Sequence, residues 1–307
     1  FVYVDQDTPA VVESVEFINE RQKVEISVEK QDAENGSTIA GAEFGLYAKE
    51  DIKAGGKVIV KADEQLCTAV TGEDGTAIFE QNLPFGSYYI KELQAPDGFV
   101  SSDEIIEVTV SYQGQDVEVV RLKEIFKNQP TTVEFRKSDL TTGVELDGAT
   151  LTVLDKDGNE IDKWTSVKGE PHIIKRLHVG ETYILREEFA PYGYLKAEEV
   201  EFTITDTAEI QKVEMKDDVP IGRIIINKKG EFLSEVSWND MVAGAMDSIW
   251  GYVTGSLKDV TFEIYAREDI KAADGESDDY YKKDELVATI KTDELGIART
   301  DDLPLGK

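Results

Sequence analysis

The stretch Tyr88-Tyr-Ile-Lys-Glu-Leu-Gln-Ala-Pro-Asp-Gly-Phe99 decides the fold, because it returns as Tyr183-Ile-Leu-Arg-Glu-Glu-Phe-Ala-Pro-Tyr-Gly-Tyr194. Each copy begins with a strand-like run that leads to a glutamate, and an Ala-Pro-x-Gly turn ends the run. A pattern of this length that occurs twice indicates that the chain repeats one structural unit.

Shorter segments repeat in the same order and add a third copy of the unit. The segment 41–53 is matched by 260–271 and, more weakly, by 148–154. A Leu-x-x-Gly turn occurs once per unit, at 83–86, 177–180 and 303–306. The third copy lacks the Ala-Pro-x-Gly motif, so we expect it to be incomplete.

These repeats predict the division of the chain into modules of about 100 residues. Residues 1–20 would supply the last strand of a truncated preceding module. The expected modules are module one at 21–129, module two at 130–219 and an incomplete module three at 220–307.

Each module is expected to be all-β. Apolar and polar residues alternate over 24–30, over 133–137 and more loosely over 224–228. Turn residues at 73–76 and 157–160 separate such runs. Many short strands joined by turns favour tandem immunoglobulin-like β-sandwich modules.

One segment departs from the β pattern and predicts a short helical insertion near 237–254. Its apolar residues recur at helical spacing: Trp238, Met241, Val242, Ala245, Met246, Ile249, Trp250 and Val253. A helix that packs its apolar face on module three is one interpretation, and an exposed patch for a partner is the other.

Composition excludes several classes of function. The net charge of −30 leaves no basic footprint for nucleic acid and disfavours an anionic membrane surface. Cys67 is the only cysteine, so no disulfide can form within the chain. His172 and His178 are the only histidines, too few for a convincing zinc site or Ser-His-Asp arrangement. We therefore expect no metal and no cofactor.

Three polar residue types recur at fixed places in the modules. A lysine ends the first strand of each, at Lys30, Lys137 and Lys228. A glutamate lies in the repeated motif, at Glu92 and Glu187. An amide or acid ends the last strand in Glu124-x-Phe126-x-Asn128 and Val213-x-Met215-x-Asp217, and Val15-x-Phe17-x-Asn19 repeats that ending upstream.

Strand phase directs these groups inward, because alternate residues of a strand face opposite ways. Lys30 shares a face with Ile26 and Val28, and Glu92 shares one with Tyr88 and Ile90. Unpaired buried charges are costly, so the three groups must satisfy one another. Burial moves a lysine and a carboxyl toward their neutral forms, which makes the amine a nucleophile and lets the protonated carboxyl polarise a carbonyl.

This arrangement resembles the CnaB-type (prealbumin-like, SpaA-type) domains of Gram-positive surface adhesins and pilins, and the glutamate motif looks like that family's E-box. The resemblance implies an isopeptide bond between the first-strand lysine and the last-strand Asn or Asp, promoted by the E-box glutamate. In module one the bond would join Lys30 to Asn128, with Glu92 as the promoting glutamate. In module two it would join Lys137 to Asp217, with Glu187 in that role. Some family members lack the bond, so a buried salt-bridged triad is the alternative.

Several positions depart from the family pattern. Module two ends in Asp217-Asp218, and strand phase favours Asp217 as the acceptor because it aligns with Met215. Glu187-Glu188 is doubled in the same way, and strand phase again selects the first. Lys228 has no E-box or closing strand to act with, and Asn19 belongs to the missing upstream module, so both are expected to stay unpaired.

The function expected from these features is a structural stalk of an extracellular, cell-wall-associated surface protein. Its only chemistry would be one intramolecular acyl transfer per module, so the chain is not an enzyme with turnover. The alternative is a module that binds a host extracellular protein or glycan directly, through loops or the 238–253 insertion. We expect a monomeric piece of a longer chain that makes no membrane contact.

Overall fold

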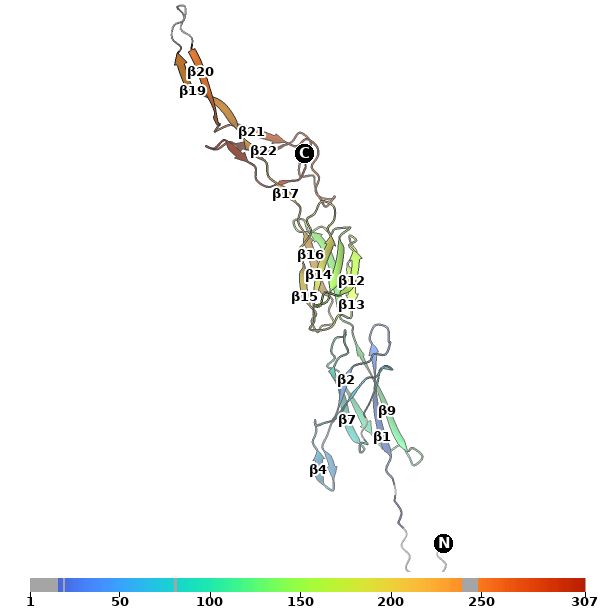
Figure 1. Ribbon diagram of the computed structural model, residues 1–307. Helices are drawn as coiled ribbons and strands as arrows, with labels where there is room; N and C mark the ends of the chain where they lie inside the picture. Colours follow the sequence, from blue (N-terminus) through green and yellow to red (C-terminus); the bar gives the residue numbers. More distant parts are fainter. Residues whose placement is uncertain (1–15, 19, 80–81, 239–247, 307) are drawn as a thin grey trace, which may run out of the picture. The chain divides into compact units, whose positions relative to one another are not determined.

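The computed structural model describes residues 16–18, 20–79, 82–238 and 248–306 (Figure 1). The described residues form 24 strands and no helix, which confirms the all-β fold class. No segment in these ranges is therefore a helix long and apolar enough to cross a membrane. The chain divides into two compact units. One comprises 1–132, 175–181 and 204–210, and the other comprises 133–174, 182–203 and 211–307.

Module one is built from two sheets and a small hairpin. The three-stranded sheet has the order β6-β1-β9, with β1 at Lys23–Asp32, β6 at Thr76–Phe79 and β9 at Val119–Asn128. The four-stranded sheet has the order β5-β2-β7-β8, with β2 at Glu43–Ala48, β5 at Gln65–Val70, β7 at Gly86–Gln94 and β8 at Ile105–Val110. The hairpin pairs β3 (Ile52–Ala54) with β4 (Lys57–Val60).

The first and last strands of module one lie side by side in parallel, with Lys30 opposite Phe126 and Asp32 opposite Asn128 (Figure 1). The alternation in β1 buries Ile26, Val28 and the side chain of Lys30 in the core. Because a strand alternates its faces, the lysine can reach the interior only in the phase of its apolar neighbours.

Module two repeats this plan. One sheet has the order β13-β10-β16, with β10 at Thr132–Asp139, β13 at His172–Lys175 and β16 at Gln211–Asp217. The other has the order β12-β11-β14-β15, with β11 at Thr150–Leu154, β12 at Glu160–Thr165, β14 at Thr182–Phe189 and β15 at Val200–Thr203. The first and last strands again run parallel, and Asp139 lies opposite Asp217.

The segment 220–306 forms only two-stranded pairs among its described residues. These are β17 (Ile221–Gly222) with β24 (Leu303–Pro304), β18 (Ile225–Asn227) with β23 (Ile297–Arg299), β19 (Lys229–Trp238) with β20 (Ser248–Ser256), and β21 (Thr261–Tyr265) with β22 (Leu286–Lys291). Phe262 and Ile264 of β21 stay half-buried, whereas the matching Phe44 and Leu46 of module one are fully buried.

The predicted helix near 237–254 is wrong for the residues that the structure describes there. Trp238 ends β19, and Ile249, Trp250 and Val253 lie in β20, which pairs with β19 in an antiparallel ribbon. Met241, Val242, Ala245 and Met246 lie outside the described residues. Apolar side chains project from both faces of the ribbon, because Ile249 and Trp250 are neighbours in an extended strand. Apolar residues that lie on both faces of a strand can recur in the sequence at the spacing expected for the apolar face of a helix.

Candidate functional site

Three strands of module one bring its lysine, glutamate and asparagine together. Lys30 comes from β1, Glu92 from β7 and Asn128 from β9, and all three side chains are buried. The Lys30 ammonium lies 5.5 Å from the ring centre of Phe44 and 5.8 Å from that of Phe126, so aromatic faces line the site.

Each member of this triad makes a polar contact with both of the others. Lys30 Nζ lies 2.7 Å from Glu92 Oε1 and also donates a hydrogen bond to Asn128 Oδ1. The Asn128 amide donates to Glu92 Oε1 at 3.0 Å and to Oε2 at 2.9 Å. The amide nitrogen that would leave in an acyl transfer is therefore already hydrogen-bonded to the glutamate.

Burial lowers the pKa of Lys30, and the neighbouring Glu92 opposes that shift. The effect has the direction that a nucleophilic amine requires, because desolvation penalises the charged ammonium. A carboxylate at 2.7 Å is also within direct reach of the proton that the amine must lose.

Module two assembles the equivalent residues from the equivalent strands. Lys137 comes from β10, Glu187 from β14 and Asp217 from β16, and all three are buried. Lys137 Nζ forms an ion pair with Asp217 Oδ1 and lies 3.0 Å from Glu187 Oε1. Asp218 and Glu188, the alternatives that the doubled sequence allowed, lie outside this cluster: Asp218 is exposed and Glu188 is half-buried.

In the second triad Asp217 Oδ2 is buried without a partner among the described residues, and Glu187 Oε1 has only the ion-pair contact with Lys137 Nζ. Burial raises the pKa of Asp217 to about 6, against the opposing effect of Lys137, and the nearby Glu187 adds to the rise. One proton shared by the two carboxyls would give an orphaned oxygen a donor and reduce their repulsion. The geometry therefore fits a triad of one lysine and two carboxyls that hold one proton.

The remaining predicted site residues lie elsewhere. Lys228 lies between β18 and β19 and is exposed. Asn19 falls outside the described residues. No group of metal-binding side chains is found in the described ranges.

Sequence reasoning missed a buried aspartate that lies two residues after the lysine of each triad. These aspartates are Asp32 and Asp139. Asp32 accepts a hydrogen bond from the Glu34 backbone, and Asp139 accepts one from the Thr141 backbone. These are turn-forming contacts in which a side chain satisfies the chain that follows it. The recurring Lys-x-Asp spacing was the available signal.

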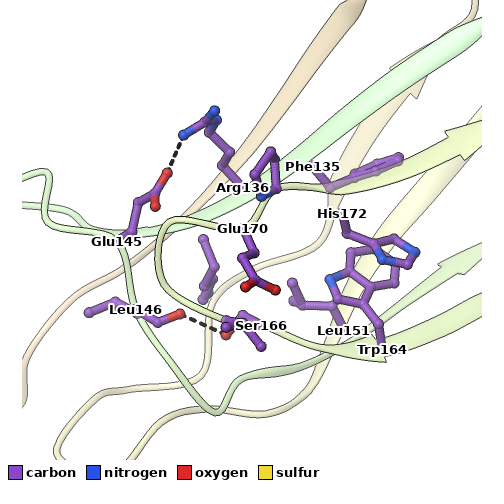
Figure 2. Close-up of a pocket in the computed structure, with 12 residues that line it drawn as sticks. Phe135, Arg136, Glu145, Leu146, Leu151, Trp164, Ser166, Glu170 and His172 are labelled. Atoms are coloured by element: carbon purple, nitrogen blue, oxygen red, sulfur yellow. Dashed lines mark hydrogen bonds and ion pairs between the residues drawn. The ribbon is translucent and has the colours of Figure 1, made fainter.

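A small cavity of about 10 Å³ lies beside β10 and β12 (Figure 2). Trp164 and His172 stack over each other next to it with ring centres 4.1 Å apart, and His172 Nε2 lies 2.8 Å from Asp162 Oδ2. Such a volume holds one water molecule at most, so the buried triads are the stronger candidates for chemistry.

Comparison with known proteins agrees with the repeated architecture. The family described as SpaA, prealbumin-like fold domain, matches residues 24–124 and again 131–219, more than half of the chain. No curated protein matches.

Several solved structures are similar to the chain. A Bacillus anthracis TIE protein is 24% identical with a TM-score of 0.47, over 93% of this chain and 44% of that one. A streptococcal ancillary pilin is 23% identical with a TM-score of 0.30, over 66% of this chain and 64% of that one. The shaft pilin SpaA of Lactobacillus rhamnosus GG is 15% identical with a TM-score of 0.29, over 65% of this chain and 98% of that one. The chain thus spans less than half the length of the TIE protein.

Proposed function

The chain belongs to the family of SpaA prealbumin-like fold domains, and on that premise we propose that it is a stalk region of a Gram-positive cell-surface adhesin or pilin-like protein. Modules one and two are each stabilised by an isopeptide bond that forms without any other enzyme. The observation that carries the proposal is the buried triad, which occurs twice on equivalent strands. Two such sites in one chain are hard to explain as core packing alone, since buried charges cost stability.

In module one the bond joins Lys30 Nζ to Asn128 Cγ. Glu92 takes a proton from the ammonium, and the neutral amine attacks the side-chain carbonyl. The bond from Cγ to the amide nitrogen breaks, and the nitrogen leaves as ammonia with a proton relayed from the amine. The ammonium, carboxylate and amide become a new amide, ammonia and a neutral Glu92. The hydrogen bonds from the Asn128 amide to Glu92 support this route for the proton.

In module two the bond joins Lys137 Nζ to Asp217 Cγ, and water leaves instead of ammonia. Attack requires a protonated Asp217. An ionised carboxylate repels the electron pair of the amine, and its oxygen is a poor leaving group. The proton shared with Glu187 supplies that form. The lysine contributes two further protons, one to the departing water and one to Glu187, which ends neutral.

The position of the bonds suits a stalk. Each joins the first strand of a module to the last, across a sequence separation of 98 residues in module one and 80 in module two. These strands are adjacent and parallel, so they would carry the load in a stretched fibre. The chain has one cysteine and therefore no internal disulfide, so the isopeptide bonds would provide the covalent cross-links instead.

Intact mass spectrometry of the folded protein tests the proposal. We expect a mass below the calculated value by one ammonia and one water. Glu92→Ala should restore only the ammonia and Glu187→Ala only the water, so each variant is the control for the other. The full calculated mass in the wild-type chain would rule out both bonds and leave two salt-bridged triads.

A second function is direct binding of a host extracellular protein or glycan by the ribbon of β19 and β20. The side chains of Trp250 and Tyr252 are 54% and 60% exposed, and aromatic residues are frequent in binding hot spots. Saturable binding to host matrix that Trp250→Ala abolishes would establish this function. A pure stalk predicts no such affinity.

A further inference from the structure

Each E-box glutamate has one contact outside its triad that the sequence motif does not contain. The backbone N–H of Ser102 donates to Glu92 Oε2 at 2.9 Å, and the backbone N–H of Ala197 donates to Glu187 Oε2 at 2.7 Å. The donor lies ten residues after the glutamate in both modules. The other carboxyl oxygen, Oε1, is the one nearest the lysine in both modules.

The same loop is also tied to the strand that carries the acceptor. Val100 N–H donates to the carbonyl of Gln129, and Leu195 N–H donates to the carbonyl of Asp218, both at 2.9 Å. Gln129 and Asp218 each follow the acceptor directly in the chain. The loop between the E-box strand and the next strand thus holds the glutamate and the acceptor strand at once.

Loop length and backbone geometry are shared here, whereas the donor's side chain is not. The donors are a serine and an alanine, so only the main-chain N–H is common to them. Inside each loop the same turn forms, with Phe99 N–H bonded to the Pro96 carbonyl and Tyr194 N–H to the Pro191 carbonyl. The Ala-Pro-x-Gly part of the motif therefore sets the path that brings the later N–H to the carboxyl.

We propose that the backbone N–H of Ser102 and of Ala197 is a positioning group for isopeptide formation, which holds Oε2 of the glutamate and leaves Oε1 to carry the proton between lysine and acceptor. The inference rests on the proposed function. An N–H that donates to Oε2 favours unprotonated oxygen there, so the proton is held at Oε1. A fixed carboxyl also loses no rotational freedom when the proton moves.

Removal of one N–H in module two tests the inference. Ala197→Pro deletes the donor, and Lys196→Pro is the matched control because no partner of its N–H is found among the described residues. Chains with a photocaged lysine at position 137 are purified in denaturant, uncaged there and refolded, and the loss of water is timed by mass. The bond of module one, which forms during expression, reports in the same molecule on chain integrity.

We expect Ala197→Pro to slow bond formation in module two by about ten- to a hundredfold, since hydrogen bonds to charged groups are among the strong ones. Its pH–rate profile should also shift to higher pH, because a pair of carboxyls that loses a hydrogen-bond donor holds its shared proton more tightly. Lys196→Pro should match the wild type in rate and profile. Equal rates, or a slower rate with an unshifted profile, would overturn the inference and leave the proposed function intact.

A backbone ester keeps the inference testable if the proline unfolds module two. Lactic acid in place of Ala197 exchanges the N–H for an oxygen and leaves the shape of the chain nearly unchanged. The same slowing and the same shift in profile are expected, and a wild-type rate would overturn the inference. A wild-type chain that loses no water at all would overturn the proposed function itself.

Discussion

The acceptor is an amide, Asn128, in the first triad and a carboxyl, Asp217, in the second. That difference changes the leaving group and the number of protons that the triad must hold. Asn128 brings a neutral amide that donates to Glu92, whereas Asp217 brings a second carboxyl to the same position. Module one is electrically balanced by one lysine and one glutamate. Module two has one lysine against two acids, so it needs an extra proton to reach the same balance. The two bonds should therefore respond differently to pH.

Bond formation in module two should be fast at pH 5 and roughly a hundredfold slower at pH 8, as the protonated fraction falls above a pKa near 6. The sign follows from the direction of the shift. Burial raises the pKa of Asp217, so the neutral, reactive acid is populated below about pH 6 and lost as pH rises through that value. Mass time courses after uncaging and refolding over pH 5 to 8 measure this dependence.

Exchange of the acceptors provides the matched control for pH. Asp217→Asn should remove the alkaline loss of rate from module two and change the leaving group to ammonia. Asn128→Asp should bring that loss of rate to module one. If Asp217→Asn keeps the dependence unchanged, the shared proton is not its source.

At the scale of elements, the proposed bond of each module would join two strands that already lie in register. β1 pairs with β9 along its whole length, and β10 pairs with β16 from Val133 to Asp139. The proposed covalent bond would therefore add little to the folded state beyond contacts that are present without it. Its effect would fall on the unfolded chain, where it would close a loop of nearly the whole module.

Loss of the bond in module one should lower its free energy of unfolding by about 5 kcal/mol, as loop closure over about 100 residues predicts. Glu92→Gln prevents bond formation, but it also leaves the buried Lys30 without its charged partner. The double variant Glu92→Gln with Lys30→Met removes that charge, and its difference from the wild type isolates the bond. Guanidinium denaturation measures both, with module two as the internal reference. An unchanged unfolding curve for the double variant would contradict the loop-closure account.

At the scale of the whole molecule, burial is unevenly distributed. Modules one and two each bury a lysine, a glutamate and an Asn or Asp together with many apolar side chains. In the segment 220–306, β21 has one described partner strand, and its Phe262 and Ile264 are half-buried. A two-stranded pair is marginally stable alone in water. Local stability should therefore differ along the chain.

Hydrogen exchange followed by mass spectrometry should show slow exchange in modules one and two and fast exchange through 221–307. The physical reason is that exchange requires local opening, which is easier where few apolar contacts must break. Lys228 should react with an amine reagent in the folded chain, whereas Lys30 and Lys137 should not. Equal protection throughout would show that the strands of 220–306 suffice for a stable module.

The sequence by itself determined the all-β class and the two tandem copies that the family model matches, because strand period and turn residues are local signals. It also determined which faces Lys30, Glu92 and Asn128 occupy, since alternation is a property of a single strand. The resemblance to SpaA-type domains, drawn from the two E-boxes, is confirmed by the family match.

Other features were decided only by tertiary structure, because they depend on which strands pair. The 238–253 segment is compatible with a helix until β19 pairs with β20. The unpartnered Asp217 oxygen of the second triad and the hydrogen bond from Ala197 N–H to Glu187 arise where β14, β16 and a loop converge. Burial and hydrogen bonds between segments distant in sequence leave no periodic signal in any one of them, so only the folded chain reveals them.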